Sequence, residues 1–378
     1  MATRPSARAA RRYAVAEAPQ IPSTRPQAAY SGNDGSTLAE LTTLRVGGPA
    51  RTLVTATTEA ELIAAVRDAD ERGEPVLLVG GGSNLVVADE GFAGTVIRIA
   101  TRGIEVDSSA CAGAFVTVAA GEVWDDLVAR AVTEGWVGIE CLSGIPGLVG
   151  ATPIQNVGAY GQEVSQTIAR VRTLDRTTGQ VRTFSNADCD FSYRHSRFKA
   201  ESDRWVVLSV AFQFELGDLS APIRYAELAR RLGVEPGQRV PATDAREAVL
   251  ALRRGKGMVL DPGDHDTWSA GSFFTNPILT LEQAAALPDD APRYPAGEGL
   301  VKTSAAWLID HAGFTKGFGA DVGTGAAQLS SKHTLALTNR GRARAADVLE
   351  LARTIRAGVE ERFGVRLVNE PVLVGCTL

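Results

Sequence analysis

Apolar and polar positions change their period several times along the chain, and these changes predict alternating strands and helices from about residue 44 onward. Short apolar or alternating runs predict strands. Apolar residues that recur every three to four positions predict amphipathic helices. The predicted strands are 51–56, 76–79, 85–88, 95–99, 115–119, 169–174, 180–184 and 205–216, with further strand-like runs around Leu367 and Val372. The predicted helices are 58–72, 122–133, 227–232, 244–254, 304–311 and 345–363.

The order of these elements predicts an α+β protein, with a strand-rich first half and a mixed second part that begins near Gly217. The first 38 residues are rich in Ala, Arg, Pro and Ser and lack apolar periodicity, so we expect a disordered tail there. No apolar run approaches the ~18 residues that a membrane-spanning helix needs. We therefore expect no membrane partner, and the scattered cysteines favour reduced thiols in a cytoplasmic protein.

The composition of the chain argues against two classes of protein, nucleic-acid binders and metal-binding proteins. The chain has 378 residues, of which 44% are hydrophobic and 22% charged, as in ordinary globular proteins of two or three domains. A formal net charge of -5 argues against a general nucleic-acid binder, which normally presents a basic face. The four cysteines are far apart and the four histidines show no metal-ligand spacing, so we expect reduced thiols and no metal site.

A glycine-rich loop follows the predicted strand 76–79. Residues 78–85 read LVGGGSNL, and successive backbone N–H groups in such a loop can converge on one anion. A tight turn between two buried strands explains the same residues. Neither the GxGxxG dinucleotide fingerprint nor the GxxxxGK[ST] phosphate loop is present, which excludes the two commonest nucleotide-binding motifs.

A second glycine-dense segment, CLSGIPGLVGATPIQNVGAYGQEV, covers residues 141–164. Long loops inside a compact domain are usually functional. A backbone so rich in glycine can lie flat against a planar ring or a phosphate, although loop packing alone also accounts for it. Cys141 occupies the position where a GxSxG nucleophile elbow requires glycine. Ser143 is therefore not predicted to be the nucleophile of a serine hydrolase.

Six motifs occur in one order from Leu41 to the C-terminus. They are LTTLRVGGPA (41–50), LVGGGSNLVVAD (78–89), LSGIPGLVGATPIQNVGAYGQEV (142–164), FSYRHSRFK (191–199), SAGSFFTNP (269–277) and NEPVLVG (369–375). Together they resemble the UDP-N-acetylenolpyruvoylglucosamine reductase family. The resemblance implies an α+β fold with a two-part FAD-binding module of the vanillyl-alcohol oxidase (PCMH) type and an α+β substrate-binding domain.

The resemblance also implies a domain layout and an activity. The tail would span 1–38, the FAD-binding module 39–216, the substrate-binding domain 217–365, and a C-terminal strand segment 366–378. Residues 223–262 resemble the extra capping segment of the family's type I branch. The implied enzyme is an NADPH-dependent flavoenzyme of peptidoglycan precursor synthesis, which reduces UDP-N-acetylglucosamine enolpyruvate to UDP-N-acetylmuramate.

Catalytic roles carry over from matching motif positions. Reduced FAD would transfer hydride from N5 to the enolpyruvyl β carbon, and Ser272 would donate the proton to the α carbon. Arg194 would pair with the substrate carboxylate, and Glu370 would act with Arg194 to polarise the substrate. Without the motifs, Ser272 would be read as a turn residue, Arg194 as part of a surface ion pair and Glu370 as a solvated side chain.

Binding roles carry over in the same way. Tyr225 and Lys256 are the expected contacts of the UDP diphosphate, because a lysine ammonium is a compact counter-charge for phosphate. The full expected substrate set is Tyr193, Tyr225, Lys256, Asn276 and Lys316. The expected FAD set is Arg45, Gly80, Gly81, Gly82, Ser83, Asn84, Ser143, Gly144, Ile145, Gly147, Gly150, Asn156, Gly158, Tyr160 and Gly161. We expect non-covalent FAD, because the glycine loop holds no His or Cys, and Cys141 is the nearest thiol in the second segment.

The sequence is also compatible with two other functions. Another FAD-dependent sugar or hydroxy-acid oxidoreductase of the same superfamily would need the two glycine-rich segments but not the three later motifs together. A catalytically inactive flavin or UDP-sugar binder would be expected to lack Ser272, Arg194 or Glu370, and all three are present. The expected ligands are therefore the enolpyruvyl UDP-sugar and NADPH, without nucleic acid, on a protein expected to be a monomer.

Overall fold

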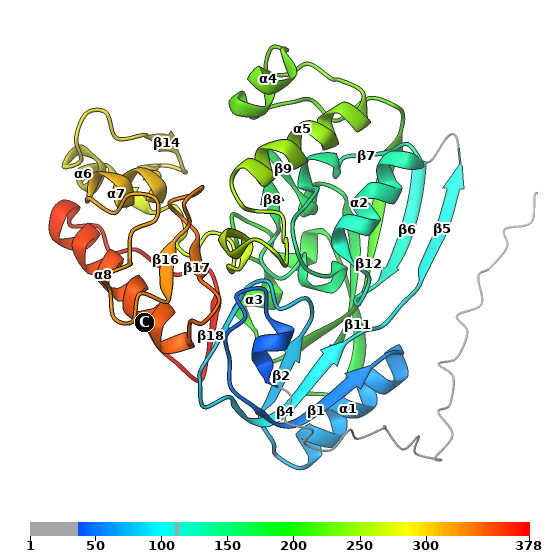
Figure 1. Ribbon diagram of the computed structural model, residues 1–378. Coiled ribbons are helices and arrows are strands. Elements are labelled where there is room, and N and C mark those ends of the chain that lie inside the picture. The colour runs from blue at the N-terminus through cyan, green and yellow to red at the C-terminus, as the bar shows by residue number, and fades with distance from the viewer. Residues whose placement is uncertain (1–36, 110–112) are drawn as a thin grey trace, which may run out of the picture.

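The computed structural model describes residues 37–109 and 113–378 (Figure 1). The predicted tail lies outside the described residues except for its last two positions, and there the prediction is wrong. Thr37 bridges to Pro49, and Leu38 is 1% exposed in an apolar cluster with Val79 and Val96. Burial of Leu38 thus places the start of the fold before residue 39. Within the described residues, no helix is both long and apolar enough to cross a membrane.

The first unit is a small parallel sheet with one covering helix. Its strands lie in the order β1 (Ala50–Ala56), β4 (Phe92–Ile99) and β2 (Val76–Val79). Helix α1 (Glu59–Glu71) begins at a capping box between Thr58 and Glu61. Because all three strands are parallel, their carboxyl ends share one edge, and the loop after β2 begins there. Ligands of open α/β sheets bind at such edges.

The second unit is a larger antiparallel sheet. Its strand order is β11–β10–β12–β6–β5, with β7 paired to the far end of β12. The strands are β5 (Ile104–Ser109), β6 (Gly113–Ala119), β7 (Trp136–Val137), β10 (Ile168–Asp175), β11 (Gln180–Ser185) and β12 (Trp205–Leu216). Helix α2 (Trp124–Thr133) packs Trp124 and Leu127 against Val116 and Phe212 of this sheet. Leu174 and Leu208 also pack with α1, so the two sheets share apolar contacts.

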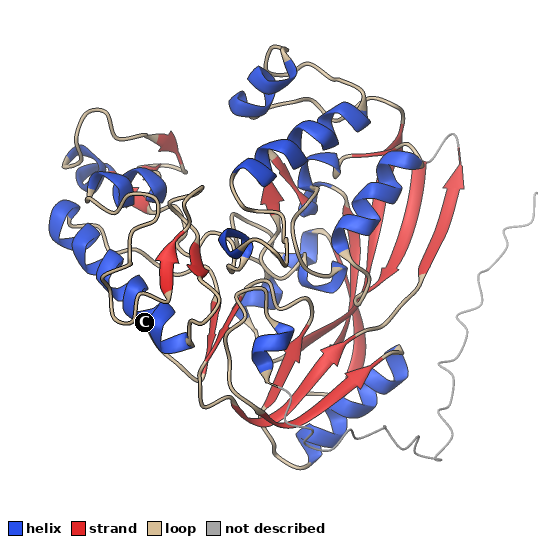
Figure 2. Ribbon diagram, in the orientation of Figure 1, coloured by secondary structure: helices blue, strands red, loops and turns tan. Residues whose placement is uncertain are grey.

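The glycine-dense segment connects β7 to β10 of the second unit through short elements. It contains the 3-10 helices η2 (Glu140–Leu142), η3 (Val149–Ala151) and η4 (Val164–Gln166), and the hairpin β8 (Gly158–Ala159) and β9 (Gln162–Glu163). The turn helices η5 (Ala187–Cys189) and α3 (Arg197–Ala200) follow between β11 and β12. Figure 2 shows this region mainly as tan loops enclosed by strands and helices.

Residues 223–262, here called the cap, lie at the top of Figure 1. The cap contains α4 (Ala226–Leu232) and α5 (Ala242–Gly255), and α4 ends at Gly233 in the left-handed region. Leu228, Ala245 and Val249 pack around Cys141 of η2. The cap therefore rests on the glycine-dense segment through its own apolar cluster, separate from the core of the C-terminal part.

The C-terminal lobe, residues 273–378, forms the left side of Figure 1. Its elements are β13 (Ile278–Thr280), α6 (Leu281–Ala285), β14 (Tyr294–Pro295), β15 (Leu300–Lys302), α7 (Ala305–His311), β16 (Ala327–Leu329), β17 (Leu337–Asn339), α8 (Ala345–Phe363) and β18 (Val372–Val374). Helix α8 supplies the apolar stripe that its sequence predicts, and it ends at Gly364 with φ 65°. This core also includes Leu44 and Val86 from the first unit.

The last strand returns to the first unit, where β18 pairs in parallel with β3 (Leu85–Val87). The prediction of a strand around Leu367 is wrong, because that segment makes only an isolated bridge between Asn369 and Phe274. The two pairings hold residue 370 between the C-terminal lobe and the loop that follows β2. The C-terminal segment that carries residue 370 therefore lies beside the loop that begins at the carboxyl end of β2.

Candidate active site

A cavity of about 350 Å³ lies where the loop after β2, the glycine-dense segment, the α3 turn and the C-terminal lobe meet. Small-molecule sites usually have volumes of about 300–1,000 Å³. Twelve residues from the sequence-predicted site line it: Gly80, Gly81, Gly82, Ser83, Asn84, Ile145, Gly147, Gly150, Gly158, Arg194, Ser272 and Glu370. The three predicted catalytic residues are therefore brought together with much of the predicted FAD set.

Close backbone packing requires glycine at two positions of this cavity. A Cβ atom on Gly81 would lie 2.7 Å from the Cα of Gly147. A Cβ atom on Gly150 would lie 2.4 Å from the Cβ of Ala120. Both distances are too short for non-bonded carbon atoms. The two glycine-rich segments thus approach each other in a way that residues with side chains would prevent.

Six predicted FAD contacts do not line the cavity: Arg45, Ser143, Gly144, Asn156, Tyr160 and Gly161. Ser143 is fully buried, and its hydroxyl donates to Asp125 Oδ1 at 2.9 Å. The backbone N–H of Gly144 donates to the same oxygen at 2.7 Å. Asp125 Oδ2 accepts from Arg246 of α5 at 3.3 Å. Ser143 and Gly144 therefore connect the glycine-dense segment, through Asp125, to Arg246 of the cap.

Asn156 and Arg45 also have protein partners. The buried Asn156 amide donates to Glu163 at 2.9 Å and to the backbone oxygen of Ser192 at 3.1 Å. Asn156 consequently supports the turn that carries Arg194. Arg45 has φ 55°, and its guanidinium carbon lies 4.1 Å from the ring centre of Trp268. That distance is within the range of a cation–π contact.

Arg194 lies at the tip of a tight turn. Ser192 and His195 close the turn with reciprocal backbone hydrogen bonds of 3.1 Å, and Arg194 adopts φ 53°. This left-handed conformation is uncommon for residues other than glycine and costs about 1 kcal/mol or more. One guanidinium nitrogen donates to the backbone oxygen of Gly158 at 2.9 Å. Such strain is typical of functional sites, where the surrounding structure fixes a side chain in place.

Glu370 approaches the same turn from the C-terminal segment. Its Oε1 lies 2.9 Å from Arg194 Nε, and both side chains are mostly buried. Gln155 Nε2 donates to Oε1 at 3.5 Å, and Asn84 Nδ2 donates to the backbone oxygen of Glu370 at 3.4 Å. Burial raises the pKa of Glu370, whereas Arg194 and Lys199 lower it. Burial and the two nearby cations thus act on the pKa of Glu370 in opposite directions. Glu370 also lines the cavity.

Ser272 reaches the cavity from the strand-like segment beside Glu370. The backbone N–H of Glu370 donates to the oxygen of Phe273 at 2.8 Å, which fixes the two segments together. Gly271 before it has φ 75°, a conformation that favours glycine. Among the described residues, no hydrogen bond involves the Ser272 hydroxyl. A hydroxyl with no protein partner at a cavity wall is free to interact with a ligand.

The five predicted substrate residues lie outside this cavity lining and fall into two groups. In the first, the Tyr160 and Tyr225 rings meet edge to face at 5.4 Å, and Lys256 Nζ lies 5.8 Å from the Tyr160 ring centre. Lys256 also forms a 2.6 Å ion pair with Glu227. Burial raises the pKa of Tyr160 to about 12. Tyr160 therefore belongs with the predicted substrate residues of the cap.

The second group lies on the C-terminal lobe and the Arg194 turn. Asn276 is beside Tyr193, and its Oδ1 accepts from the backbone N–H of Ala305 at 3.0 Å, at the start of α7. Lys302 Nζ lies 4.6 Å from the Tyr193 ring centre. Lys316, in the loop after α7, is exposed. Tyr193 adjoins Arg194, which lines the cavity, whereas the Lys316 side chain has no hydrogen bond or ion pair with a lining residue in the described part of the chain.

The structure adds three residues that sequence reasoning did not assign. Lys199 lines the cavity, and its Nζ donates to the backbone oxygen of Arg194 at 2.9 Å. Arg253 Nε and Trp205 Nε1 are buried at the cavity and have no acceptor among the described residues. Burial lowers the pKa of Arg253. Lys199 could have been found from the FSYRHSRFK motif, whereas nothing in the sequence distinguishes Arg253 or Trp205.

Two protein families match the chain. Residues 261–374 match the family described as UDP-N-acetylenolpyruvoylglucosamine reductase, C-terminal domain. Residues 50–185 match the family described as FAD binding domain. These two ranges contain every predicted catalytic residue except Arg194, which lies between them.

Known proteins match over nearly the whole chain. UDP-N-acetylenolpyruvoylglucosamine reductase of Streptomyces coelicolor is 64% identical over 352 residues, covering 90% of each chain. That of Cutibacterium acnes is 62% identical, covering 92% of each. The crystal structure of the reductase from Thermus caldophilus superposes with a TM-score of 0.61 at 28% identity, over 90% of this chain and 97% of that chain. These findings confirm the predicted fold class and support FAD as the cofactor.

Proposed function

Because the chain belongs to the UDP-N-acetylenolpyruvoylglucosamine reductase family, we propose that it reduces UDP-N-acetylglucosamine enolpyruvate with Arg194, Ser272 and Glu370 as catalytic residues. The observation that carries this proposal is the convergence of these three side chains on one cavity with the glycine-rich segments. The product would be UDP-N-acetylmuramate, a precursor of peptidoglycan.

The cavity fits a planar, acceptor-rich cofactor such as FAD. Gly81, Gly147 and Gly150 line the cavity, so part of its wall is backbone without side chains. Arg253 Nε and Trp205 Nε1 are donors without acceptors, and a buried donor left unpaired costs about 1–3 kcal/mol. A ligand with carbonyl and phosphate oxygens would satisfy them. No cysteine or histidine is among the residues that line the described cavity, which supports non-covalent binding.

Arg194 and Glu370 would act on the substrate carboxylate. Bound FAD, once reduced by NADPH, supplies the hydride that adds to the enolpyruvyl β carbon. Negative charge then develops on the α carbon and the carboxylate. The Arg194 guanidinium is fixed by Gly158 and Glu370 and can form charge-assisted hydrogen bonds to a carboxylate. Donors fixed before the reaction stabilise such charge without reorganisation.

Ser272 would complete the reaction by proton donation to the α carbon. Serine is a weak acid, so this role requires a strongly basic carbon centre and a well-placed hydroxyl. Two observations support this role: the backbone of residue 273 is hydrogen-bonded to that of residue 370, and the Ser272 hydroxyl has no protein partner among the described residues. The UDP diphosphate would be held outside the cavity by Lys256, Tyr225 and Lys316. Tyr193 and Asn276 would be further substrate contacts.

The activity is tested by NADPH oxidation with the purified, FAD-loaded protein. We expect absorbance loss at the nicotinamide band only when UDP-N-acetylglucosamine enolpyruvate is present, with UDP-N-acetylmuramate formed in equal amount. Free sugars and 2-hydroxy acids are tested separately as electron donors that reduce the bound flavin without NADPH, because the alternative function is another FAD-dependent oxidoreductase of this superfamily. Turnover of one of those compounds, without turnover of the UDP-sugar, would contradict the proposal.

A further inference from the structure

Glu140, the first residue of η2, has no exposed surface. Its Oε2 accepts the backbone N–H of Gly138 at 2.7 Å. Its Oε1 accepts two hydrogen bonds, from Gln162 Nε2 at 2.8 Å and from the backbone N–H of Ala221 at 2.6 Å. A buried carboxyl group needs such donors, because burial of its oxygens without hydrogen bonds is costly. One carboxyl oxygen thus joins the β8–β9 hairpin, which carries Gln162, to the chain just before the cap.

Ala221 belongs to the base of the cap, here called the neck, which consists of residues 218–223 and 237–242. The two halves of the neck are paired through their backbones. The N–H of Ser220 donates to the oxygen of Val240 at 2.7 Å, and further hydrogen bonds of the same kind lie on either side. The hydrogen bond from Ala221 to Glu140 therefore holds both halves of the neck against the glycine-dense segment.

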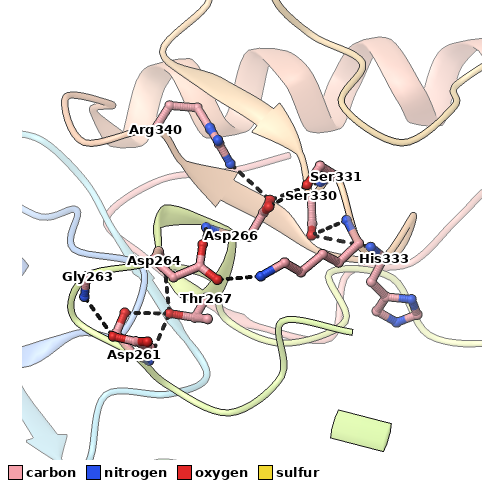
Figure 3. Close-up of polar contacts among 10 residues, drawn as sticks. Asp261, Gly263, Asp264, Asp266, Thr267, Ser330, Ser331, His333 and Arg340 are labelled. Carbon is pink, nitrogen blue, oxygen red and sulfur yellow. Dashed lines mark hydrogen bonds and ion pairs between the residues drawn. The ribbon is translucent and has the colours of Figure 1, made fainter. Parts of the chain in front are cut away.

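The other end of the cap is fixed to the C-terminal lobe by a polar network (Figure 3). Asp266, just past the end of the cap, accepts hydrogen bonds from the backbone N–H and the hydroxyl of Ser331, and from Arg340 at 2.9 Å. Lys332 is paired with Asp264 in the same network. The cap is thus attached to the C-terminal lobe at its exit and to the glycine-dense segment at its entry.

The two segments that Glu140 joins carry two tyrosines that face each other. Tyr160 lies in the turn of the β8–β9 hairpin, and Tyr225 lies between the neck and α4. Their rings meet edge to face at 5.4 Å. A Cβ atom on Gly161 would lie only 3.3 Å from the Cβ of Arg224, so the two backbones are in contact beside the rings. Tyr225 is 44% exposed, so its place depends on the neck more than on burial of its own ring.

We propose that Glu140 is a positioning residue for the reductase reaction, which holds the neck against the β8–β9 hairpin and thereby fixes Tyr225 where the UDP-sugar would bind. This inference rests on the proposed function, in which Tyr225 is a substrate contact. Glu140 is fully buried and does not line the cavity, so it acts through other residues. A contact residue that is ordered before binding spares the ligand the entropic cost of ordering it. Loss of the Glu140 hydrogen bonds should therefore weaken substrate capture and leave the flavin chemistry unchanged.

The test is Glu140→Gln in the FAD-loaded protein. Glutamine has the same shape, but its NH2 group would face an N–H donor that the carboxyl group accepts, so at least one of the three hydrogen bonds is lost. We expect KM for UDP-N-acetylglucosamine enolpyruvate to rise by ~10-fold, with kcat at saturating NADPH within about threefold of wild type and an unchanged FAD content. Calorimetric binding of the same compound to the oxidised protein should weaken in parallel. Hydrogen exchange over residues 218–225 should become faster, because the Ala221 amide loses its acceptor.

Glu235→Gln is the matched control, because Glu235 is an exposed residue of the cap. It should keep the wild-type KM. A KM for Glu140→Gln within about twofold of wild type would overturn the inference, and so would an equal loss of kcat and FAD content, which indicates a purely structural role. Both outcomes leave the reductase function standing. A wild-type protein that does not reduce the UDP-sugar would overturn the proposed function itself.

A second variant decides the question if Glu140→Gln does not fold. Gln162→Met removes one of the two donors to Glu140 Oε1 and leaves the carboxyl group in place. It should raise KM by ~3-fold with kcat unchanged, because the hairpin is then held to the neck by fewer hydrogen bonds. An unchanged KM in Gln162→Met would likewise overturn the inference.

Discussion

Arg194 Nε lies 2.9 Å from Glu370 Oε1. Arg194 comes from the turn after β11, and Glu370 comes from the segment before β18, the last strand of the chain. The pairing of β18 with β3 beside the glycine loop holds Glu370 next to this turn. The C-terminal lobe must therefore dock on the first unit before the site is complete, and docking places a buried carboxyl group against the Arg194 turn.

Replacement of Glu370 by glutamine should impair the reaction without loss of FAD. The change keeps the shape of the side chain but removes its charge, so Arg194 loses its ion-pair partner and its fixed position. We expect kcat to fall by ~100-fold or more, while the flavin absorbance per protein stays unchanged. The exposed Glu298→Gln is the control. A kcat within twofold of wild type would show that Glu370 is not catalytic.

Ser272→Ala should separate the two half-reactions. Loss of the hydroxyl removes the proposed proton donor but changes no residue that would act in flavin reduction. Anaerobic flavin reduction by NADPH should stay near the wild-type rate, and reduction of the enolpyruvyl substrate should fall by ~100-fold or more. Stopped-flow absorbance at the flavin band measures both rates. Ser108→Ala, on the exposed part of β5, is the control; equal slowing of both half-reactions would contradict the role.

Gly81→Ala should weaken FAD binding. The added methyl group would lie 2.7 Å from the Cα of Gly147, so one of the two cavity-forming segments must shift. We expect most of the flavin to be lost during purification, with less than about a tenth of the wild-type content. Gly217→Ala is the control, because its Cβ would meet only Val137 Cγ2 at 3.8 Å. A full complement of FAD in Gly81→Ala would refute the close-packing argument.

Asp175 should stabilise the fold in a pH-dependent way. Its side chain has no exposed surface and accepts two hydrogen bonds from Arg204, at 3.1 and 3.0 Å. The hydrogen bonds from Arg204 lower the pKa of Asp175 to about 2. A lowered carboxyl pKa gives stability that is present above the unfolded-state pKa, about 3.9, and that disappears as the pH falls through the folded-state value.

Asp175→Asn should therefore lower the free energy of unfolding by about 2 kcal/mol at neutral pH. The difference from wild type should shrink as the pH falls from about 4 to about 2. Urea unfolding of the FAD-loaded proteins, followed by circular dichroism, measures both values. The exposed Asp107→Asn serves as the control. A pH-independent difference would show that the charge of Asp175 is not the source of its effect.

Sequence periodicity located the elements that are long or strongly patterned. Strand 205–216 and helix 345–363 have the predicted bounds, because each presents a sustained apolar pattern. Strands β13 to β17 were missed, since each has only two or three residues, too few to show an apolar period. The strand expected around Leu367 is absent for a related reason: its neighbour, Asn369, makes only one isolated bridge.

For the site, too, local motifs identified residues, whereas their contacts depend on the folded structure. Motifs placed Arg194, Ser272 and Glu370 at one cavity, although nothing in their local sequence shows that they meet. The environments of Ser143 and Asn156 could not be predicted, because their partners are Asp125 and Ser192 from other segments. Unpaired donors such as Arg253 Nε are recognised only after burial is known.

The most direct measurement is the visible spectrum of the purified protein under anaerobic conditions. We predict flavin bands that bleach when NADPH is added and return when UDP-N-acetylglucosamine enolpyruvate follows, with one UDP-N-acetylmuramate formed per flavin reoxidised. Flavin that bleaches with NADPH but is not reoxidised by this compound would contradict the proposed substrate. A protein that takes up no FAD would contradict the assignment of the cavity itself.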